Sequence, residues 1–203
     1  MKSIHFDGRE YQPSKIVCIG QNYVEHIREL GNEIPSQPVI FIKPNSAISG
    51  SVCTHEVDPV HHEGEIAFVV IGGELAGVGF GLDLTKREIQ TGLRKKGLPW
   101  ERSKAFDGSA VFSEFVSTGG DLVNLRLELW INGRLAQQGG YDLMMNKPWA
   151  ILDEVGSFLT FEDGDVIMTG TPKGVGPINT GDTMTGKIFA GQELLVQDSW
   201  VVR

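Results

Sequence analysis

The sequence predicts a β-rich α+β fold with a few short helices. Short apolar runs rich in β-branched and aromatic residues recur along the chain, helical periodicity is scarce, and 26 of the 203 residues are glycine. Short strands bounded by turn residues are typical of sheet-rich folds. The chain contains no internal repeat and no Pro/Ser-rich linker. We therefore expect one domain over residues 15–203, preceded by a short N-terminal extension over residues 1–14.

Seven segments carry the strand pattern. In chain order they are 15–20, 38–43, 65–72, 76–84, 125–133, 165–170 and 192–203. The clearest alternation begins at residue 125, where four apolar side chains share one face, namely Leu125, Leu127, Leu129 and Ile131. The Asn132-Gly133 pair that follows predicts a hairpin turn, because both residues accept the positive φ angles of tight turns.

Three short segments predict helices, namely 22–30, 85–97 and 148–159. The first is followed by Gly31, which suits a helix C-terminus. The second begins at Thr85 with Glu88 three residues later, which is the spacing of a capping box, and it ends at Gly97. The third begins with Pro148, a residue favoured in the first helical turn.

The bulk composition excludes several classes of protein. The formal net charge is −8 and no Lys/Arg cluster is present, so neither a nucleic acid nor an anionic membrane is expected as a partner. The two cysteines, Cys18 and Cys53, form no CxxC motif, which favours a reducing compartment. Residues 1–15 contain no apolar signal segment, and no stretch is long enough to span a bilayer. We therefore expect a cytoplasmic protein.

The segment VHHEGEIAFVV, residues 60–70, places two carboxylates at the start of an apolar strand. Glu63 and Glu65 point to the same face of that strand, where the chain enters the core. Two buried like charges need a proton, a salt bridge or a cation. Mg²⁺ and Mn²⁺ prefer carboxylate oxygens and retain exchangeable water ligands, so a metal site is one explanation. The alternative is an exposed strand end at which both acids are solvated.

Asp83 offers a third carboxylate at the end of another apolar strand. By itself it fits an acid that interacts with the N-terminus of the following helix. Together with Glu63 and Glu65 it predicts a set of three metal-binding carboxylates. His61 and His62 lie nearby, but imidazole suits softer metals, so we expect them behind the ligands or at the surface.

Two further patterns favour an active site. His26 and Glu29 lie three residues apart on a predicted helix, where a carboxylate can orient an imidazole as a general base; an ordinary surface pair gives the same spacing. Lys104 could contact an anionic substrate or be solvated. The glycine-rich segment 168–177 lacks the Walker spacing, so a nucleotide site is not expected. A rigid turn that presents backbone N–H groups and the Thr171 hydroxyl to an oxyanion fits better.

Six segments, taken in order, resemble the fumarylacetoacetate hydrolase family, and within it the branch of acylpyruvate hydrolases and oxaloacetate decarboxylases. The resemblance runs from about residue 16 to the C-terminus. The segments are GQNYVEHIREL, PVIFIKP, HHEGEIAFVV, GFGLDLTKREIQ, KKGLPWERSKAFDGSA and GDVIMTGTPKGVGP. One loop, FDGSAVFSEFV, copies no branch pattern closely, and this difference bears on the choice of substrate.

The resemblance implies a mixed β-roll or sandwich, a homodimer and a Mg²⁺ or Mn²⁺ site. Residue by residue, it implies metal-binding roles for Glu63, Glu65 and Asp83, and catalytic roles for His26, Glu29 and Lys104. It also implies contacts with the substrate for Arg87, Gln90 and Thr171. The segment that carries His26 and Glu29 orders into a lid in relatives that bind a ligand.

The function that follows is metal-dependent hydrolysis of a C–C bond. The substrate is a small 2-oxo acid, an acylpyruvate (2,4-dioxo acid), and the products are pyruvate and a carboxylic acid. Decarboxylation or tautomerisation of oxaloacetate could use the same site. A hydratase or isomerase of 2-oxo-enoic diacids is a second interpretation, and a non-catalytic β domain that binds a structural ion is a third.

Overall fold

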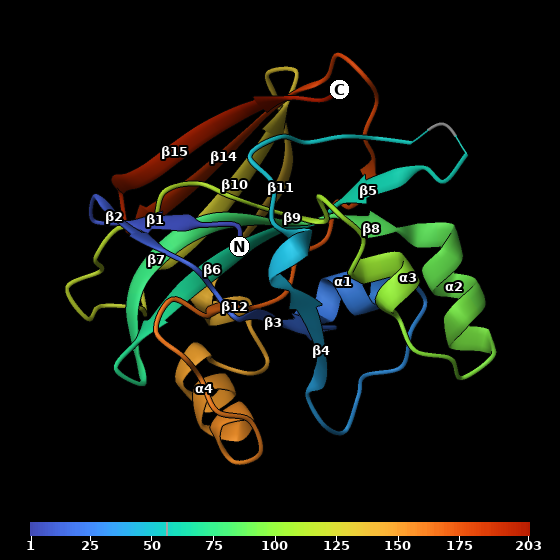
Figure 1. The fold of residues 1–203 in the computed structure, drawn as a ribbon. Helices are drawn as coiled ribbons and strands as arrows, with labels where there is room; N and C mark the ends of the chain where they lie inside the picture. Colours follow the sequence, from blue (N-terminus) through green and yellow to red (C-terminus); the bar gives the residue numbers. More distant parts are fainter. Residues whose placement is uncertain (56) are drawn as a thin grey trace.

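Two curled sheets packed face to face form the centre of the molecule (Figure 1). The computed structural model describes residues 1–55 and 57–203. The larger sheet has the order β4-β3-β12-β6-β7-β9, from β3 (Lys15–Gly20), β4 (Val39–Pro44), β6 (Gly64–Ile71), β7 (Glu74–Asp83), β9 (Ala110–Phe112) and β12 (Val166–Met168). The smaller sheet has the order β11-β10-β14-β15, from β10 (Leu125–Ile131), β11 (Arg134–Gly140), β14 (Thr183–Ala190) and β15 (Glu193–Val201).

Short elements surround this sandwich. A hairpin of β1 (Ile4–Phe6) and β2 (Arg9–Tyr11) forms one small sheet, and β5 (Val60–His62), β8 (Thr85–Lys86) and β13 (Gly176–Pro177) form another. The described residues contain four α-helices, α1 (Val24–Glu29), α2 (Arg87–Lys95), α3 (Glu101–Lys104) and α4 (Pro148–Gly156), and two 3₁₀ turns, η1 (Asn45–Ala47) and η2 (Tyr141–Leu143). Helices α1, α2 and α3 gather at one end of the sandwich, beside β4 and β8 (Figure 1).

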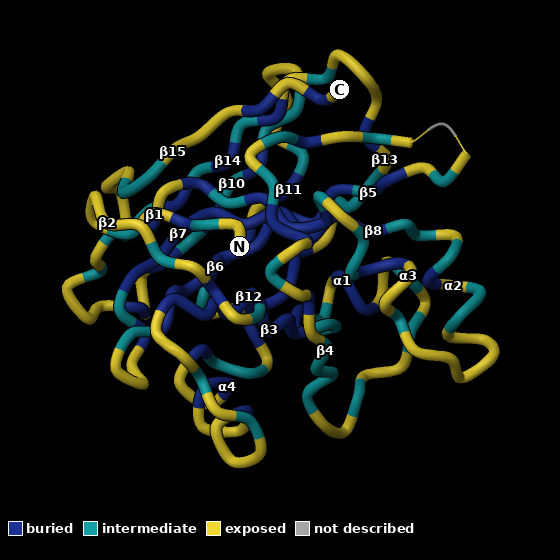
Figure 2. Tube along the Cα trace, viewed as in Figure 1, coloured by how far each residue is buried: buried dark blue, intermediate teal, exposed yellow. Residues whose placement is uncertain are grey.

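Strand β6 lies at the centre of the core because both of its faces are covered. Ile66 and Phe68 belong to the apolar cluster between the two sheets, whereas Ala67 and Val69 pack in a second cluster on the opposite face. An uninterrupted apolar run is typical of a strand buried on both faces. The burial colours show the same arrangement, with buried strands inside and exposed loops outside (Figure 2).

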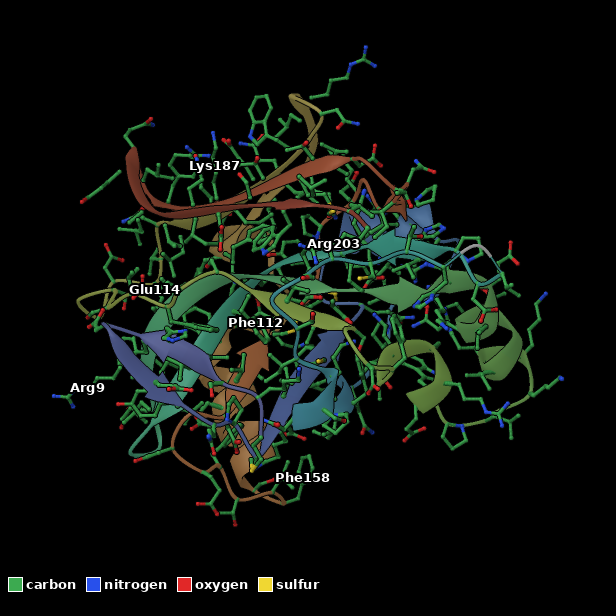
Figure 3. The ribbon with its side chains drawn as sticks, turned by 45° about the horizontal axis from the view of Figure 1, so that its top comes forward. Arg9, Phe112, Glu114, Phe158, Lys187 and Arg203 are labelled. Atoms are coloured by element: carbon green, nitrogen blue, oxygen red, sulfur yellow. The ribbon has the colours of Figure 1, made fainter. Side chains whose placement is uncertain are left out.

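The two sheets approach closely where a glycine lies opposite an aromatic ring. Phe80 of β7 stacks on Trp200 of β15 with ring centroids 6.1 Å apart. A Cβ atom at Gly186 of β14 would lie 2.2 Å from the Phe80 ring, so this position excludes a side chain. Figure 3 shows the side chains that fill the space between the sheets, with Lys187 on the outer side of β14.

The predicted class, a β-rich fold with few short helices, is confirmed. The larger sheet is mixed, since β12 runs parallel to β3 and antiparallel to β6. All seven predicted strands are present within a few residues of the predicted bounds. The predicted turn is also present, with φ angles of 51° at Asn132 and 75° at Gly133. Among the described residues, no helix combines the length and the apolar composition needed to span a membrane.

Two local predictions are corrected. The second helix begins at Arg87 rather than Thr85, and no capping box forms: the Thr85 hydroxyl donates to the Asp83 carbonyl (3.0 Å) while residues 85–86 pair as β8. Strand β14 was not predicted, because Gly186 interrupts the apolar alternation of its sequence TMTGKIFA at the point where Phe80 requires space.

Asp165 connects the beginning of β3 to the beginning of β12. Its buried carboxylate accepts hydrogen bonds from the backbone N–H groups of Ser14, Lys15 and Glu162 (2.8, 3.1 and 2.9 Å) and pairs with the Lys15 ammonium. Burial alone would raise the pKa of this carboxyl, but the hydrogen bonds and the ammonium outweigh burial and hold the pKa below its usual value.

Replacing Asp165 with Asn is expected to lower the free energy of unfolding by about 2–4 kcal/mol, because buried donors and a cation lose their carboxylate. Since the folded pKa lies below the unfolded pKa of about 3.9, the contribution of Asp165 is fully present above that value and disappears as the pH falls through the folded pKa. Denaturant titrations of both proteins at neutral pH and at lower pH measure the difference.

Asp163→Asn is the matched control, because its exposed carboxylate accepts one hydrogen bond, from the Gly72 N–H (2.7 Å). We expect it to cost less than about 1 kcal/mol. Equal losses in the two variants, or a loss in Asp165→Asn that does not change with pH, would contradict the account of Asp165.

Candidate active site

Three carboxylates meet at the end of the β6–β7 pair. Glu65 lies in β6, and Glu63 precedes that strand. Asp83 ends the antiparallel neighbour β7, where its backbone N–H donates to the Glu63 carbonyl (2.9 Å). One oxygen of each carboxylate lies within 4.8 Å of the others, and the three residues are at most 5% exposed. The predicted set of acids is therefore assembled, and the alternative of a solvated strand end is wrong.

Three cationic side chains neutralise these acids. The Lys104 ammonium donates to Glu63 Oε2 (2.7 Å) and to Asp83 Oδ2 (2.6 Å). Arg87 pairs with the other oxygen of Glu63. The Lys43 ammonium lies 2.9 Å from Asp83 Oδ1.

Glu65 differs from the other two acids because none of these cations pairs with it. Burial raises the pKa of Glu65 well above its usual value, and the nearby charges of Asp83 and Glu63 raise it further. Burial also opposes ionisation of Glu63, but the charges of Lys104 and Arg87 outweigh burial and lower its pKa. Without a bound cation, Glu65 therefore holds a proton more readily than Glu63 does.

The donor set fits a hard divalent cation. Three carboxylates in one buried cluster supply the oxygen ligands that Mg²⁺ and Mn²⁺ prefer. Asp83 Oδ1 is buried, and the geometry of its contact with Lys43 is not that of a hydrogen bond. Lys104 occupies one oxygen of Glu63 and one of Asp83, and a carboxylate has about four lone-pair sites, so these acids retain acceptor capacity for a metal.

Lys43 was not predicted as a site residue. It is fully buried near the end of β4, and its ammonium also donates to the backbone carbonyl of Lys104. A buried lysine needs an acidic partner. The one sequence signal was its position, a lysine at the end of the apolar run PVIFIKP, and sequence spacing could not identify Asp83 as its partner.

The turn between β12 and β13 supports Glu65. The Gly170 N–H donates to Glu65 Oε2 (2.7 Å), and the φ angle of Gly170 is 95°. A Cβ atom at this position would lie 2.9 Å from the Ile19 carbonyl oxygen, so only glycine fits. The turn presents this N–H group to Glu65, and a contact of the turn with a substrate oxyanion stays a prediction.

The Thr171 hydroxyl lies at the cavity, and its predicted contact with a substrate stays a prediction. The hydroxyl donates its proton to the Gly64 carbonyl (3.0 Å) and accepts a hydrogen bond from Gln137 Nε2 (2.8 Å). A hydroxyl has one proton to donate. In this conformation the Thr171 proton is directed to a backbone carbonyl, and an acceptor lone pair is left for a ligand. Gln137, fully buried on β11, was not predicted; it also accepts from the Gly64 N–H (2.8 Å).

Helix α1 brings His26 and Glu29 to the same centre. His26 Nδ1 lies 3.1 Å from Glu29 Oε2, and Glu29 Oε1 accepts from the Gly174 N–H (2.9 Å). His26 is 4% exposed, so the alternative of an ordinary surface pair is wrong. Buried Asn22 anchors the beginning of this segment by donating to the Thr169 carbonyl (2.8 Å), and Gln21 adopts a φ of 57°, which is uncommon for a residue other than glycine.

A small cavity of about 30 Å³ lies among these groups, beneath α1. Seven of the nine predicted site residues line it, namely His26, Glu63, Glu65, Arg87, Gln90, Lys104 and Thr171. The other two do not line the cavity but contact residues that do: Glu29 contacts His26, and Asp83 accepts from Lys104. Because such a cavity holds about one water molecule, α1 covers the centre closely in this conformation.

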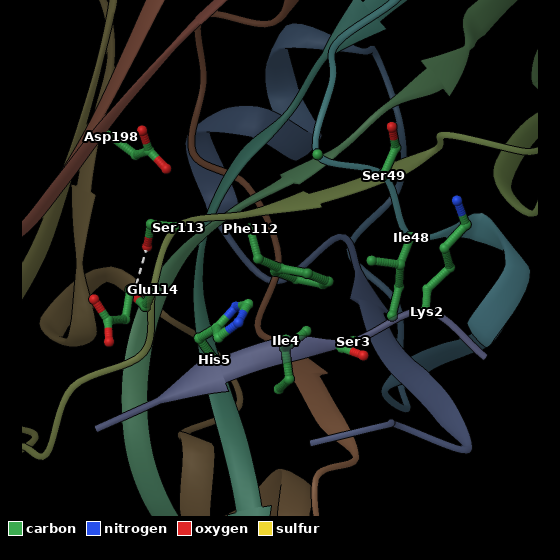
Figure 4. Close-up of a pocket in the computed structure, with 11 residues that line it drawn as sticks. Lys2, Ser3, Ile4, His5, Ile48, Ser49, Phe112, Ser113, Glu114 and Asp198 are labelled. Carbon is green, nitrogen blue, oxygen red and sulfur yellow. Dashed lines mark hydrogen bonds between the residues drawn. The ribbon is translucent and has the colours of Figure 1, made fainter. Parts of the chain in front are cut away.

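A larger groove of about 460 Å³ lies between β1, β9 and β15 (Figure 4). Lys2 stands at one end of this groove, and Glu114 and Asp198 stand at the other. These three charged side chains are exposed to solvent, and none of the predicted site residues lines the groove. Because the predicted site residues gather at the smaller cavity and not in this groove, the chemistry of the molecule concentrates at the smaller cavity.

His61 and His62 lie on β5, behind Glu63. His62 is 3% exposed, and burial lowers its pKa to about 4, so it is neutral at physiological pH. Neither histidine belongs to the cluster of three acids. This placement agrees with the expectation that they stand behind the ligands or at the surface.

Comparison with known proteins identifies the family to which the chain belongs. Residues 15–197 match the family described as Fumarylacetoacetate (FAA) hydrolase C-terminal. The chain is 40% identical to oxaloacetate tautomerase YcgM of Escherichia coli over 195 residues, which cover 87% of this chain and 89% of that protein.

Two crystal structures share the fold. A protein of Oleispira antarctica with a provisional fumarylacetoacetate isomerase/hydrolase name superimposes with a TM-score of 0.92 and 36% identity, over 100% of both chains. Fumarylpyruvate hydrolase of Pseudomonas aeruginosa, in complex with Mn²⁺ and pyruvate, gives a TM-score of 0.87 and 27% identity, over 99% of this chain and 95% of that chain.

Proposed function

Because the chain belongs to the fumarylacetoacetate hydrolase family, we propose that it is an enzyme that binds a small 2-oxo acid beside a divalent cation, Mg²⁺ or Mn²⁺. The observation that carries this proposal is the buried cluster of Glu63, Glu65 and Asp83, whose ligand atoms lie within 4.8 Å of one another. The cation would polarise the 2-oxo group and stabilise negative charge on its oxygen. The three acids would hold this cation.

Oxaloacetate is the substrate that we propose first, in a keto–enol tautomerisation. A relative with this activity in its name is 40% identical to the chain. The charges of the centre also favour a dianion. Three ionised acids balance the cations Lys43, Arg87 and Lys104, so a bound divalent cation would leave two positive charges. A substrate with two carboxylates neutralises them.

His26 would move the proton. Its Nδ1 contacts Glu29, which fixes the ring and leaves Nε2 for the transfer. In the tautomerisation Nε2 takes a proton from C3, and the electron pair of that C–H bond moves into a C2–C3 double bond. The 2-oxo oxygen gains the negative charge and then a proton. Arg87 Nε, which is buried and has no hydrogen-bond partner among the described residues, is available to the carboxylate beside the 2-oxo group.

Hydrolysis of an acylpyruvate is the second candidate, and the contact between buried His26 and Glu29 favours it. In this reaction Nε2 takes the proton from water, and the oxygen attacks the C4 carbonyl. The C3–C4 bond then breaks, its electron pair remains with the pyruvate half, and the other half leaves as a carboxylic acid. The solved relative with pyruvate in its complex is named as a hydrolase of this kind.

The test is a panel of oxaloacetate, acetylpyruvate and fumarylpyruvate, assayed with Mg²⁺ and again after chelation. We expect conversion of at least one substrate that depends on the metal. Pyruvate release identifies cleavage, whereas an unchanged number of carbon atoms identifies tautomerisation, hydration or isomerisation. Turnover of the panel without any metal would contradict the proposal.

The melting temperature of the chelated protein separates an enzyme from a domain that binds a structural ion. Because Lys43, Arg87 and Lys104 already neutralise the acids, we expect chelation to abolish turnover while the protein remains folded. A large fall in melting temperature, with no turnover to lose, would favour the structural ion instead.

Three expectations drawn from the sequence stay predictions. They are the boundary between an extension over 1–14 and a domain over 15–203, the assembly as a homodimer, and the cytoplasmic location. Light scattering of the purified chain would test the dimer.

A further inference from the structure

One face of α2 extends the site beyond the residues discussed above. Arg87, Gln90 and Arg94 lie at positions i, i+3 and i+7 of this helix, so they share a face. All three line the small cavity, and all three also line an adjoining hollow of about 370 Å³. Leu30 and Asn32, which follow α1, face them across both spaces. The hollow therefore continues the cavity outward, between α1 and α2.

Arg94 is the cation of this face that no acid neutralises. Arg87 and Lys104 pair with Glu63 at the centre. Among the described residues, no carboxylate oxygen lies within 4.0 Å of the Arg94 guanidinium. Its one side-chain hydrogen bond runs from Nη2 to Asn32 Oδ1 (3.0 Å). Arg94 thus brings an uncompensated positive charge to the edge of the cavity.

Asn32 presents an unused donor beside that charge. A guanidinium carries only donors, so the atom of Asn32 that faces Arg94 must be the carbonyl oxygen. This contact fixes the orientation of the amide. The Nδ2 group is buried and has no hydrogen-bond partner among the described residues. A buried donor without a partner is costly, and an oxygen acceptor from a ligand would remove this cost.

We propose that Arg94 and Asn32 form a subsite for the distal carboxylate of a short 2-oxo dicarboxylic acid. This inference rests on the proposed function, because the 2-oxo carboxylate end of the same molecule lies beside Glu63, Glu65 and Asp83. A carboxylate accepts a charge-assisted hydrogen bond from the guanidinium and a second one from the Asn32 amide. The subsite therefore selects diacids over monoacids of the same length.

Binding of a diacid at this subsite would also hold α1 closed over the cavity. Asn32 follows α1, which carries His26, whereas Arg94 belongs to α2. A carboxylate held by both residues links the segment above the cavity to the helix beside it. A diacid is therefore expected to hold His26 over the reacting carbon more firmly than a monoacid does.

Two probes that differ at the distal end test the subsite. The full-length protein loaded with Mg²⁺ is titrated by calorimetry with 2-oxopentanoate, which ends in a methyl group, and with 2-oxoglutarate, which has the same number of carbon atoms and ends in a carboxylate. The KM for oxaloacetate is measured in parallel. Arg94→Gln is expected to weaken the binding of 2-oxoglutarate, and to raise the KM for oxaloacetate, by about tenfold or more. The affinity for 2-oxopentanoate is expected to change less than about twofold.

Asn32→Asp separates a subsite from a structural latch. This variant keeps an oxygen facing Arg94 and strengthens that contact, but it removes the Nδ2 donor and neutralises the guanidinium. The subsite predicts a loss of diacid affinity similar to that in Arg94→Gln. A latch that only closes α1 onto α2 predicts unchanged or tighter binding of both probes. Arg28→Gln, at an exposed arginine of α1 that pairs with Glu25, controls for the loss of one positive charge.

The outcomes distinguish this inference from the proposed function. Wild-type protein that binds neither probe and converts no oxaloacetate would overturn both. Wild-type protein that binds both probes equally well would overturn the subsite alone, and so would equal losses for the two probes in Arg94→Gln. Intact diacid binding in Asn32→Asp would also overturn it.

Discussion

Replacing Glu65 with Gln is expected to abolish tight binding of Mg²⁺ or Mn²⁺ and to lower turnover by about 10³-fold or more. A bound cation supplies several kcal/mol of charge stabilisation in the transition state, and each 1.36 kcal/mol is a factor of ten in rate. Glu65 is the most informative of the three acids. None of the three cations at the centre pairs with it, and it accepts a hydrogen bond from the Gly170 N–H.

The fold is expected to survive this substitution. Burial raises the pKa of Glu65, so the metal-free protein already favours the neutral form of this side chain. Gln has the same shape as a protonated Glu and keeps the oxygen that accepts from Gly170. We therefore expect a melting temperature close to that of the metal-free wild type, together with loss of the calorimetric signal of Mn²⁺ binding.

Glu74→Gln is the matched control, because Glu74 is exposed at the other end of β7. We expect this control to bind Mn²⁺ as the wild type does. If Glu65→Gln bound the metal with unchanged affinity, Glu65 would not be a ligand, and the assignment of the three acids would fail.

Replacing His26 with Ala is expected to damage hydrolysis far more than decarboxylation. Hydrolysis of acetylpyruvate needs a base that deprotonates water, and one general base contributes about 10²–10⁴ in rate. Loss of CO₂ from oxaloacetate needs no attacking water. We therefore expect kcat for hydrolysis to fall by that factor, and kcat for decarboxylation to fall by less than about tenfold.

Glu29→Gln tests the orientation of His26. The amide keeps an oxygen for the Gly174 N–H and loses the charge that fixes the imidazole. We expect a smaller loss of hydrolysis than in His26→Ala, again with decarboxylation retained. The measurement is kcat of His26→Ala and of Glu29→Gln for hydrolysis of acetylpyruvate and for decarboxylation of oxaloacetate. Equal damage to the two reactions in His26→Ala would show that the histidine does not act on a separate water.

The acids at the centre could be predicted because strand geometry is local. Glu63 and Glu65 lie two residues apart, so any strand through them places both on one face. The grouping of Asp83 with these acids was predicted from its position at the end of another apolar strand and from the resemblance to a family, whereas the β6–β7 register that brings it there is seen only in the structure. The His26–Glu29 contact was likewise accessible from helical spacing.

The partners of the acids could not be predicted because they come from distant parts of the chain. Lys43 reaches Asp83 across 40 positions of sequence, and Gln137 reaches Gly64 across 73 positions. Neither contact follows from any local period. The sequence also could not predict that no acid pairs with Arg94, because this depends on which acids pair with the other cations in the folded structure.

The departures from the predicted elements have local physical causes. Thr85 has the residue type and spacing of a helix cap, but the pairing of β8 with β5 holds it in extended backbone. Strand β14 was not predicted from the sequence because Gly186 stands where the alternating pattern needs an apolar residue, opposite Phe80. In both cases tertiary packing outweighs a local preference.

Anomalous scattering from crystals grown with Mn²⁺ and oxalate tests the central claim most directly. We expect one strong manganese peak that carboxylate oxygens of Glu63, Glu65 and Asp83 coordinate, with oxalate on the same ion. A manganese peak elsewhere, or none at all, would contradict the account.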